Sequence, residues 1–122
     1  MKTAVVIEDE SDVRTLLADT LERTGFTVYS AATGLEGVEL VRVHAPIVTT
    51  LDIGMPGIDG FETAKCIRAI STTYLLMLTA RTEQSDMLLG LQAGADAYIT
   101  KPFRPREFRA RVEAMMRRPR VQ

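Results

Sequence analysis

Residues 49–60 read TTLDIGMPGIDG, a short β-branched run that stops at one carboxylate, Asp52. The run favours a strand, and the Pro- and Gly-rich segment after it requires a sharp turn in which backbone can approach a group held by Asp52. Aspartate is also common at ordinary turns. This stretch alone leaves both interpretations open, a turn residue or the carboxylate of a site.

Apolar spacing divides the remaining chain into alternating strands and helices. Thr33 and Glu36 match a capping box, and Gly25 and Gly94 stand where helices end. The spacing predicts strands at 4–7, 26–31, 47–51, 74–78 and 97–100, and helices at 11–24, 33–44, 61–70, 83–93 and 105–118. Strict alternation predicts an α/β fold, a single doubly wound parallel sheet with helices on both faces.

The pattern has one unusual feature in its central strand. Thr49 and Thr50 are more polar than the residues that a buried strand usually carries, and their hydroxyls must find partners.

The second helix is expected to place Leu35, Val38 and Val41 on one apolar side.

Four of the five predicted strands end in polar side chains. In an open parallel sheet, ligands bind at the carboxyl ends of the strands. The side chains expected to converge there are Glu8 and Asp9, Asp52, Thr79 and Lys101. Three carboxylates about 4 Å apart repel by roughly 4 kcal/mol per pair at a dielectric near 20, so a cation is expected, and oxygen ligands suit Mg²⁺ or Mn²⁺.

The same residues suit phosphoryl transfer. Thr79 and Lys101 can hold phosphoryl oxygens, and Asp52 can accept the group as an acyl phosphate. The sequence contains no GxxxxGK[ST] loop, so bound ATP is not the expected donor.

Composition limits the other chemistry. One cysteine, Cys66, and one histidine, His44, provide neither an internal disulfide nor a His/Cys metal site, and we expect both to be structural or surface residues. No apolar run reaches membrane-spanning length, so we expect a cytoplasmic protein without membrane contact. Residues 1–100 carry 7 basic and 14 acidic side chains, while residues 101–122 carry 8 and 2. Because acids interrupt it, the basic tail is expected to be a solvated helix face rather than a nucleic-acid patch.

Four motifs in order, VVIEDE, LDIGMPGIDG, LTA and ADAYITKPF, resemble the receiver (CheY-like) domain of two-component response regulators over residues 3–118. The resemblance implies a flavodoxin-like strand order 2-1-3-4-5 and a cis Lys101–Pro102 bond. It also implies a phosphoacceptor that assists its own phosphorylation and dephosphorylation rather than an ordinary enzyme.

The resemblance assigns a role to each motif residue. Asp52 accepts the phosphoryl group from a histidine kinase. Mg²⁺ is held by Asp9, Asp52 and the backbone carbonyl of Gly54, with Glu8 acting through water. Thr79 and Lys101 hold the phosphoryl group, and Thr79 and Tyr98 act as the switch. Residues expected to influence the lifetime of the phosphorylated state are Gly54, Ala80 and Arg81.

The segment KPFRPREFRARVEAMMRR further resembles the OmpR/PhoB type, in which a winged-helix DNA-binding domain follows the receiver. We expect a receiver at 1–118 and the start of a linker or tail at 119–122, with DNA contacted only through a domain outside this chain; the alternative is a stand-alone receiver. The resemblance implies a homodimer through the fourth helix, fifth strand and fifth helix. Candidate interface residues are Asp96, Glu107, Arg111, Met87 and Leu89, although Ala97 replaces a usual acid and Met87 a usual base.

Three other functions are weighed against the receiver. A haloacid dehalogenase-type phosphohydrolase would need its nucleophile in a D-x-D pattern after the first strand, where this chain has Glu8-Asp9-Glu10. A flavodoxin would need a Ser/Thr-rich first loop instead of an anionic one. A docking module without phosphorylation would not need every chemical position that this sequence retains.

Overall fold

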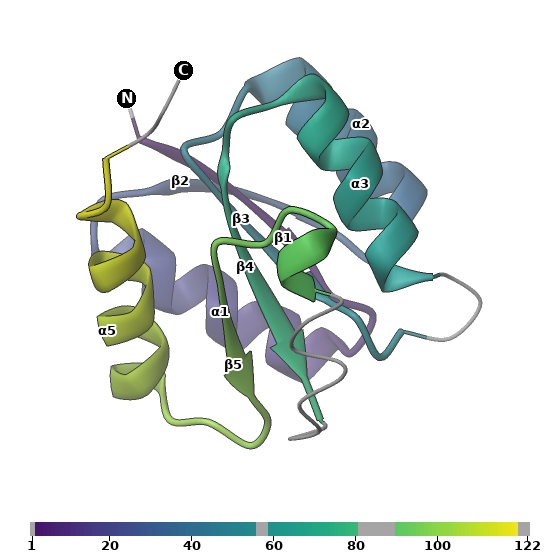
Figure 1. Cartoon of the computed structure of the whole chain (residues 1–122). Helices are drawn as coiled ribbons and strands as arrows, with labels where there is room; N and C mark the ends of the chain where they lie inside the picture. The colour runs from purple at the N-terminus through teal and green to yellow at the C-terminus, as the bar shows by residue number, and fades with distance from the viewer. Residues whose placement is uncertain (1, 56–58, 81–89, 120–122) are drawn as a thin grey trace.

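The computed structural model describes residues 2–55, 59–80 and 90–119, and it contains one five-stranded sheet with helices on both faces (Figure 1). All strand pairs are parallel and their order is β2-β1-β3-β4-β5, which confirms the predicted fold and order. In chain order the elements are β1 (Thr3–Ile7), α1 (Ser11–Arg23), β2 (Thr27–Ala31), α2 (Gly34–His44), β3 (Val48–Asp52), α3 (Gly60–Ile70), β4 (Tyr74–Thr79), β5 (Ala97–Thr100) and α5 (Pro105–Met116).

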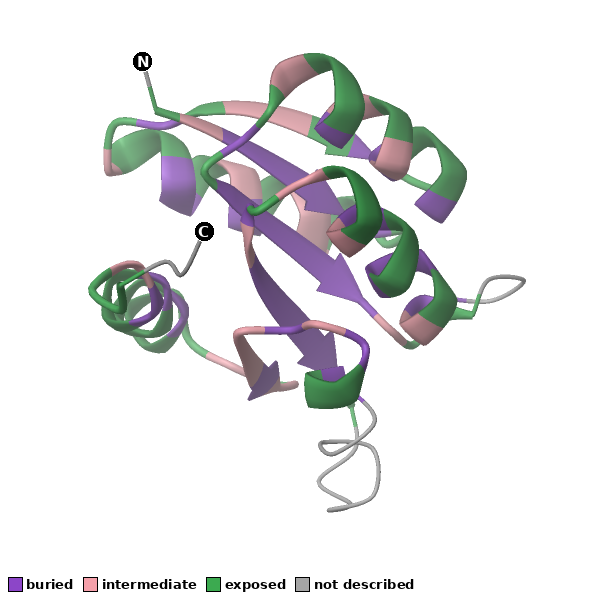
Figure 2. Ribbon diagram, turned by 45° about the horizontal axis from the view of Figure 1, so that its top comes forward, coloured by how far each residue is buried: buried purple, intermediate pink, exposed green. Residues whose placement is uncertain are grey.

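The three inner strands, β1, β3 and β4, are largely buried on both sides, because alternate residues feed two separate cores (Figure 2), whereas the edge strands β2 and β5 are partly exposed. In β1, Ala4 and Val6 pack toward α1 and α5 together with Leu17 and Phe108. Val5 and Ile7 belong to the second cluster, whose helical members lie in α2 and α3 and include Val41, Ala64 and Ile67. This double burial explains why the strands appear in the sequence as continuous apolar runs.

Local capping chemistry sets the helix ends. Glu36 N donates to Thr33 Oγ1 at 3.2 Å, and the Glu36 carboxylate accepts from Ala32 N at 3.1 Å, so the predicted capping residues are used. Gly25 follows α1 with φ 97°, a conformation that favours glycine. Asp59 caps α3 by accepting from Phe61 N and Glu62 N, a role that the sequence analysis did not assign.

The expectation for α2 is wrong at one residue. Leu35 is 86 % exposed, and the inward positions are Gly34, Gly37 and Val41. A Cβ at Gly37 would lie 2.3 Å from Ile7 Cδ1, so glycine lets α2 approach β1 closely. Val41 and the partly buried Val38 do pack against the core, as expected, so the expectation fails only at Leu35, and glycine forms the rest of the packing face.

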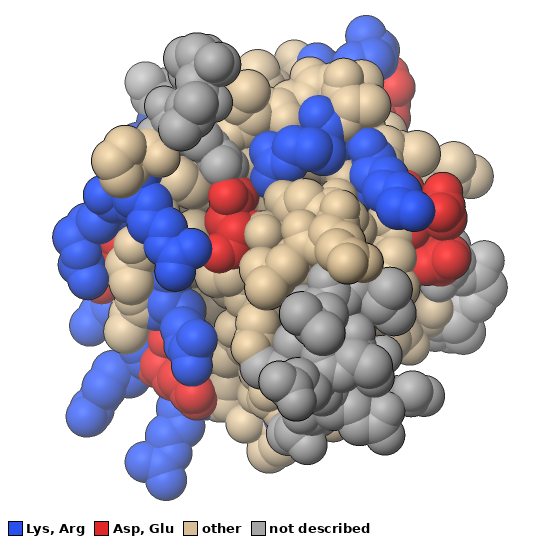
Figure 3. Space-filling model, viewed as in Figure 1, with Lys and Arg blue, Asp and Glu red and all other residues tan. Residues whose placement is uncertain are grey.

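The predicted helix at 83–93 falls mostly outside the described residues, where only 90–92 are helical. Within the described ranges, no helix is long and apolar enough to cross a membrane. The arginines at 104, 106, 109, 111, 117 and 118 are exposed, and blue side chains gather over α5 in Figure 3, in keeping with a solvated basic face.

Candidate functional site

Asp52 is the last residue of β3, the central strand of the sheet. Its neighbours β1 and β4 leave the residue only 4 % exposed. The turn that follows contributes a backbone donor, because Gly54 N donates to Asp52 Oδ1 at 2.8 Å. The Gly-rich turn predicted from the sequence therefore does bring backbone against this carboxylate.

The end of β1 supplies three further acids. Glu8 is fully buried, whereas Asp9 and Glu10 are exposed. The loop is held by Arg14, whose Nη1 donates to the carbonyl oxygens of Glu8 at 2.9 Å and Asp9 at 3.3 Å. This role of Arg14 could not be predicted from the sequence, because a basic residue in the first turns of a helix carries no signal that it folds back onto the preceding loop.

Lys101 brings a positive charge to these acids from the end of β5. Its Nζ donates to Asp52 Oδ2 at 2.8 Å and to Glu8 Oε1 at 3.1 Å, and lies 3.8 Å from Glu10 Oε1. Backbone also ties the two strand ends, since Lys101 N donates to Thr79 O at 2.7 Å. Thr79 is buried at the end of β4, and the Lys101–Pro102 bond is cis, as expected.

Burial and proximity change the protonation of the site. Burial, followed by hydrogen bonding to and repulsion from the adjacent Asp52 carboxylate, raises the pKa of Glu8 from 4.5 to about 7. Burial alone would lower the pKa of Lys101, but its hydrogen bonds to Asp52 and Glu8 outweigh burial and leave that pKa raised. One ammonium is thus shared between two carboxylates, one of which holds its proton near neutral pH.

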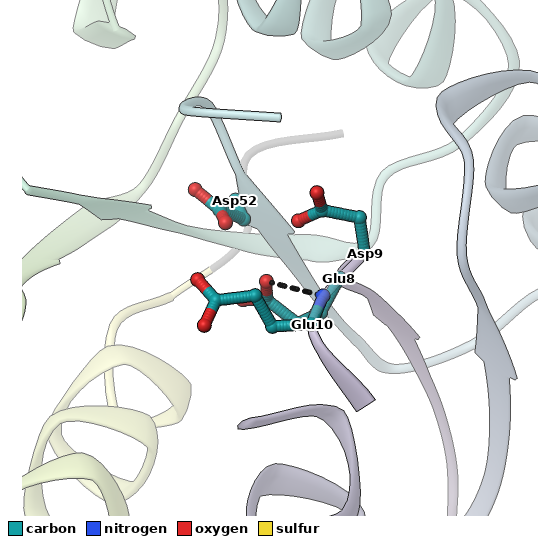
Figure 4. Close-up of side chains that lie close together, drawn as sticks. All are labelled: Glu8, Asp9, Glu10 and Asp52. Carbon is teal, nitrogen blue, oxygen red and sulfur yellow. Dashed lines mark hydrogen bonds between the residues drawn. The ribbon is translucent and has the colours of Figure 1, made fainter. Parts of the chain in front are cut away.

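The four acids form a compact oxygen-only cluster. Each of Glu8, Asp9, Glu10 and Asp52 offers a carboxylate oxygen, and these atoms all lie within 4.8 Å of one another (Figure 4). Oxygen ligands with room for water are what Mg²⁺ prefers, so the donor set fits this ion. Glu10, whose amide donates to Glu8 Oε2 at 3.2 Å, belongs to the cluster although the sequence analysis gave it no role.

The expected switch and interface residues lie along β5 and α5. Tyr98 is partly buried against the core on the α2 and α3 side, and its carbonyl accepts from Arg111 Nη1 at 3.5 Å. Glu107 and Arg111 are exposed on α5. Asp96 is engaged within its own chain, where Oδ2 accepts from Arg68 and from Leu75 N. Three expected residues, Met87, Leu89 and Arg81, lie outside the described residues.

The geometry agrees with a comparison against protein families. The model for the response regulator receiver domain matches residues 4–113. The chain belongs to this family. Receiver domains bind Mg²⁺ at an acidic pocket and interact with histidine kinases, and this receiver has such a cluster at the carboxyl end of its sheet.

Two curated relatives and one solved structure narrow the type of receiver. The chain is 42 % identical over 121 residues to the alkaline phosphatase synthesis transcriptional regulatory protein PhoP of Bacillus subtilis, covering 98 % of this chain and 50 % of that protein. It is 41 % identical over 118 residues to the transcriptional regulatory protein AfsQ1 of Streptomyces coelicolor, covering 97 % and 52 %. The response regulator DrrB, an OmpR/PhoB homolog from Thermotoga maritima, aligns with a TM-score of 0.85 and 30 % identity over 96 % of this chain and 53 % of DrrB.

These similarities confirm the resemblance to OmpR/PhoB-type receivers. The chain spans about half the length of the curated relatives it matches.

Proposed function

We propose that Asp52 is the phosphoacceptor of this receiver and that a histidine kinase supplies the phosphoryl group. The observation that carries the proposal is the position of Lys101, whose Nζ bonds both Asp52 and Glu8. The carboxylates repel one another, so the site favours binding of a metal cation. The Lys101 ammonium beside Asp52 can in turn pair with a negatively charged phosphoryl group.

In the transfer step, an Asp52 carboxylate oxygen forms a bond to phosphorus while the bond from phosphorus to the donor breaks, and the donor keeps that electron pair. Bound Mg²⁺, held by Asp9, Asp52 and the Gly54 carbonyl with Glu8 through water, would supply neutralisation of the phosphoryl charge. Lys101 pairs with one phosphoryl oxygen and the Thr79 hydroxyl donates to another. In the unmodified chain Gly54 N bonds Asp52 Oδ1 and Lys101 Nζ bonds Oδ2. We therefore expect Lys101 to move from the carboxylate to the phosphoryl oxygen as the acyl phosphate forms.

Hydrolysis of the acyl phosphate would use the same contacts in the presence of water, so the receiver assists both its phosphorylation and its dephosphorylation. Gly54 and Ala80 are exposed next to the strand ends that carry Asp52 and Thr79. We expect their side chains, together with that of Arg81, to control how water approaches the phosphoryl group.

Phosphorylation would act as a switch by drawing Thr79 toward the phosphoryl group and Tyr98 after it, which changes the surface formed by the fourth helix, β5 and α5. The relatives of twice this length are named as transcriptional regulatory proteins. We therefore favour control of a DNA-binding output domain that follows a linker starting near residues 119–122, over a receiver that acts alone by protein contacts.

Intact mass after incubation with a small acyl phosphate tests the proposal. With Mg²⁺, the chain should gain the mass of one phosphoryl group. Chelation of the metal, or the substitution Asp52→Asn, should abolish the gain, whereas Asp59→Asn, which removes an acid outside the cluster and keeps a capping oxygen, should not. Equal phosphorylation of the parent and Asp52→Asn would show that another residue is the acceptor.

A further inference from the structure

Arg118, the second residue after α5, is held by the starts of two strands. Tyr74 Oη donates to the carbonyl oxygen of Arg118 at 2.6 Å, and Arg118 Nη1 donates to the carbonyl oxygen of Asp96 at 2.9 Å. Tyr74 begins β4 and Asp96 directly precedes β5. Because α5 runs back along the sheet against the strand direction, its end reaches these strand starts (Figure 1).

Asp96 is itself fixed from inside the molecule. Its Oδ2 accepts from Arg68 Nη2 at 3.1 Å and from Leu75 N at 2.8 Å. The side chains of Arg68 and Asp96 are only 27 % and 18 % exposed, so this ion pair is less screened than those on the helix surfaces.

Arg68 also connects the pair to the surrounding backbone. Its Nε and Nη2 donate to Gly94 O at 3.1 and 2.7 Å, and its Nη1 donates to Ser71 O and Thr73 O. One guanidinium in α3 thus holds the loop before β5 (residues 93–96) against the loop before β4. The position of Asp96, on which Arg118 rests, depends on this connection.

We propose that Tyr74, Asp96 and Arg118 form a clasp that sets the direction in which the chain leaves α5, and that Arg68 ties this direction to the loop at 93–96. A displacement of that loop has to move the acceptor of Arg118 and therefore the chain that follows. Through the clasp, a movement on the face that contains β5 changes the direction of the chain that follows α5. It does not depend on phosphorylation of Asp52, so it can be tested in the unmodified chain.

Hydrogen exchange of the backbone amides at 114–118 measures the clasp. Tyr74→Phe removes only the hydroxyl, and Arg118→Ala removes the second bond. Each should lower the protection of these amides, relative to the unfolded rates of the same variant, by about two- to tenfold, while amides in β1 and β3 keep theirs. Arg117→Ala, the matched loss of an exposed neighbouring charge, should leave protection unchanged. Protection equal to the parent in both clasp variants would overturn the proposal.

Asp96→Asn tests the tie through Arg68, because it leaves intact the backbone carbonyl that accepts from Arg118 and removes only the charge facing Arg68. The tie predicts lower protection at 114–118 as well as at 93–96. If exchange accelerates at 93–96 alone, or at neither segment, the loop and the exit of α5 are independent and the tie is wrong.

Discussion

The site around Lys101 and Asp52 carries an arrangement of charge that suits ligand binding but lowers the stability of the metal-free chain. In the metal-free chain the ammonium offsets the repulsion among four neighbouring acids, but the acids exceed what one cation can neutralise. A binding site that holds excess charge of one sign is destabilised until its ligand arrives. The same residues should therefore respond in opposite directions to loss of the cation and loss of an anion.

Lys101→Met, which keeps the apolar stem, should lower the free energy of unfolding in the absence of divalent metal by about 3 kcal/mol, since it leaves buried Glu8 and Asp52 without their cation. Asp52→Asn should raise it by about 1 kcal/mol, because it removes one of the mutually repelling charges. Denaturant unfolding measures both, with Asp59→Asn as the control for loss of an acid elsewhere. Equal destabilisation by Lys101→Met and Asp52→Asn would contradict this description of the site.

Glu8 should make the stability of the metal-free chain depend on pH. Its pKa is about 7 in the folded chain and near 4.5 when exposed, so the folded state holds the proton more tightly. The stabilisation from protonated Glu8 is fully present below about pH 4.5 and is lost as pH rises through 7. Unfolding measured from pH 5 to 8 should show a fall on the order of 1–3 kcal/mol that Glu8→Gln removes. If the free energy of unfolding of Glu8→Gln falls equally with pH, a group other than Glu8 causes the pH dependence.

At the scale of elements, β3 combines two threonines with opposite surroundings. Thr49 Oγ1 lies 3.0 Å from Thr73 Oγ1, so this buried hydroxyl has a partner. Thr50 Oγ1 is buried and, among the described residues, has no hydrogen-bond partner. The sequence predicted that both hydroxyls need partners, but which one finds a partner depends on the residue that the fold places across the sheet.

Thr50→Val should therefore stabilise the chain by about 1 kcal/mol, because it replaces an unsatisfied buried hydroxyl by a methyl group of the same shape. Thr49→Val should destabilise it by about 1 kcal/mol, since it leaves the Thr73 hydroxyl without this contact. Thermal and denaturant unfolding of the two variants form a matched comparison. A loss of stability in Thr50→Val would show that its hydroxyl is satisfied, for example by internal water.

The elements themselves were largely predictable, because their bounds depend on local chemistry such as the Thr33 capping box and Gly25. The packing face of α2 was predictable only at Val38 and Val41. Gly37, where a Cβ would clash with Ile7, has no apolar side chain to indicate that it faces the sheet. Arg14 and Arg68 were missed for a related reason. Their partners are backbone carbonyls whose positions only the folded chain defines.

At the scale of the whole molecule, the convergence of the site could be predicted because parallel strands present their carboxyl ends at one edge. The predicted interface is less simple. Asp96 is occupied by Arg68 and Leu75 within the chain, which leaves Glu107 and Arg111 as the exposed charges of the expected dimer face. Dimerisation through this face should therefore depend on Arg111 more than on the other arginines of α5.

Sedimentation of the chain after phosphorylation tests this dependence. Phosphorylation should shift the monomer toward a dimer, and Arg111→Ala should weaken that dimer by about three- to tenfold through loss of interface charge pairs. Arg109→Ala, which removes another exposed arginine from the side of α5 that faces Glu113, should not. Equal weakening by the two substitutions would point to net charge, and no weakening by either would place the interface on another face.

The central claim, that Asp52 is the phosphoacceptor, is tested most directly by locating the modified residue. The chain is treated with acyl phosphate and Mg²⁺ and then reduced with borohydride, which converts an aspartyl phosphate to homoserine. Peptide sequencing by mass spectrometry should find homoserine at position 52, and only when both the acyl phosphate and Mg²⁺ were present before reduction. Aspartate unchanged at position 52, with homoserine at position 9 or at another aspartate, would contradict the proposed site.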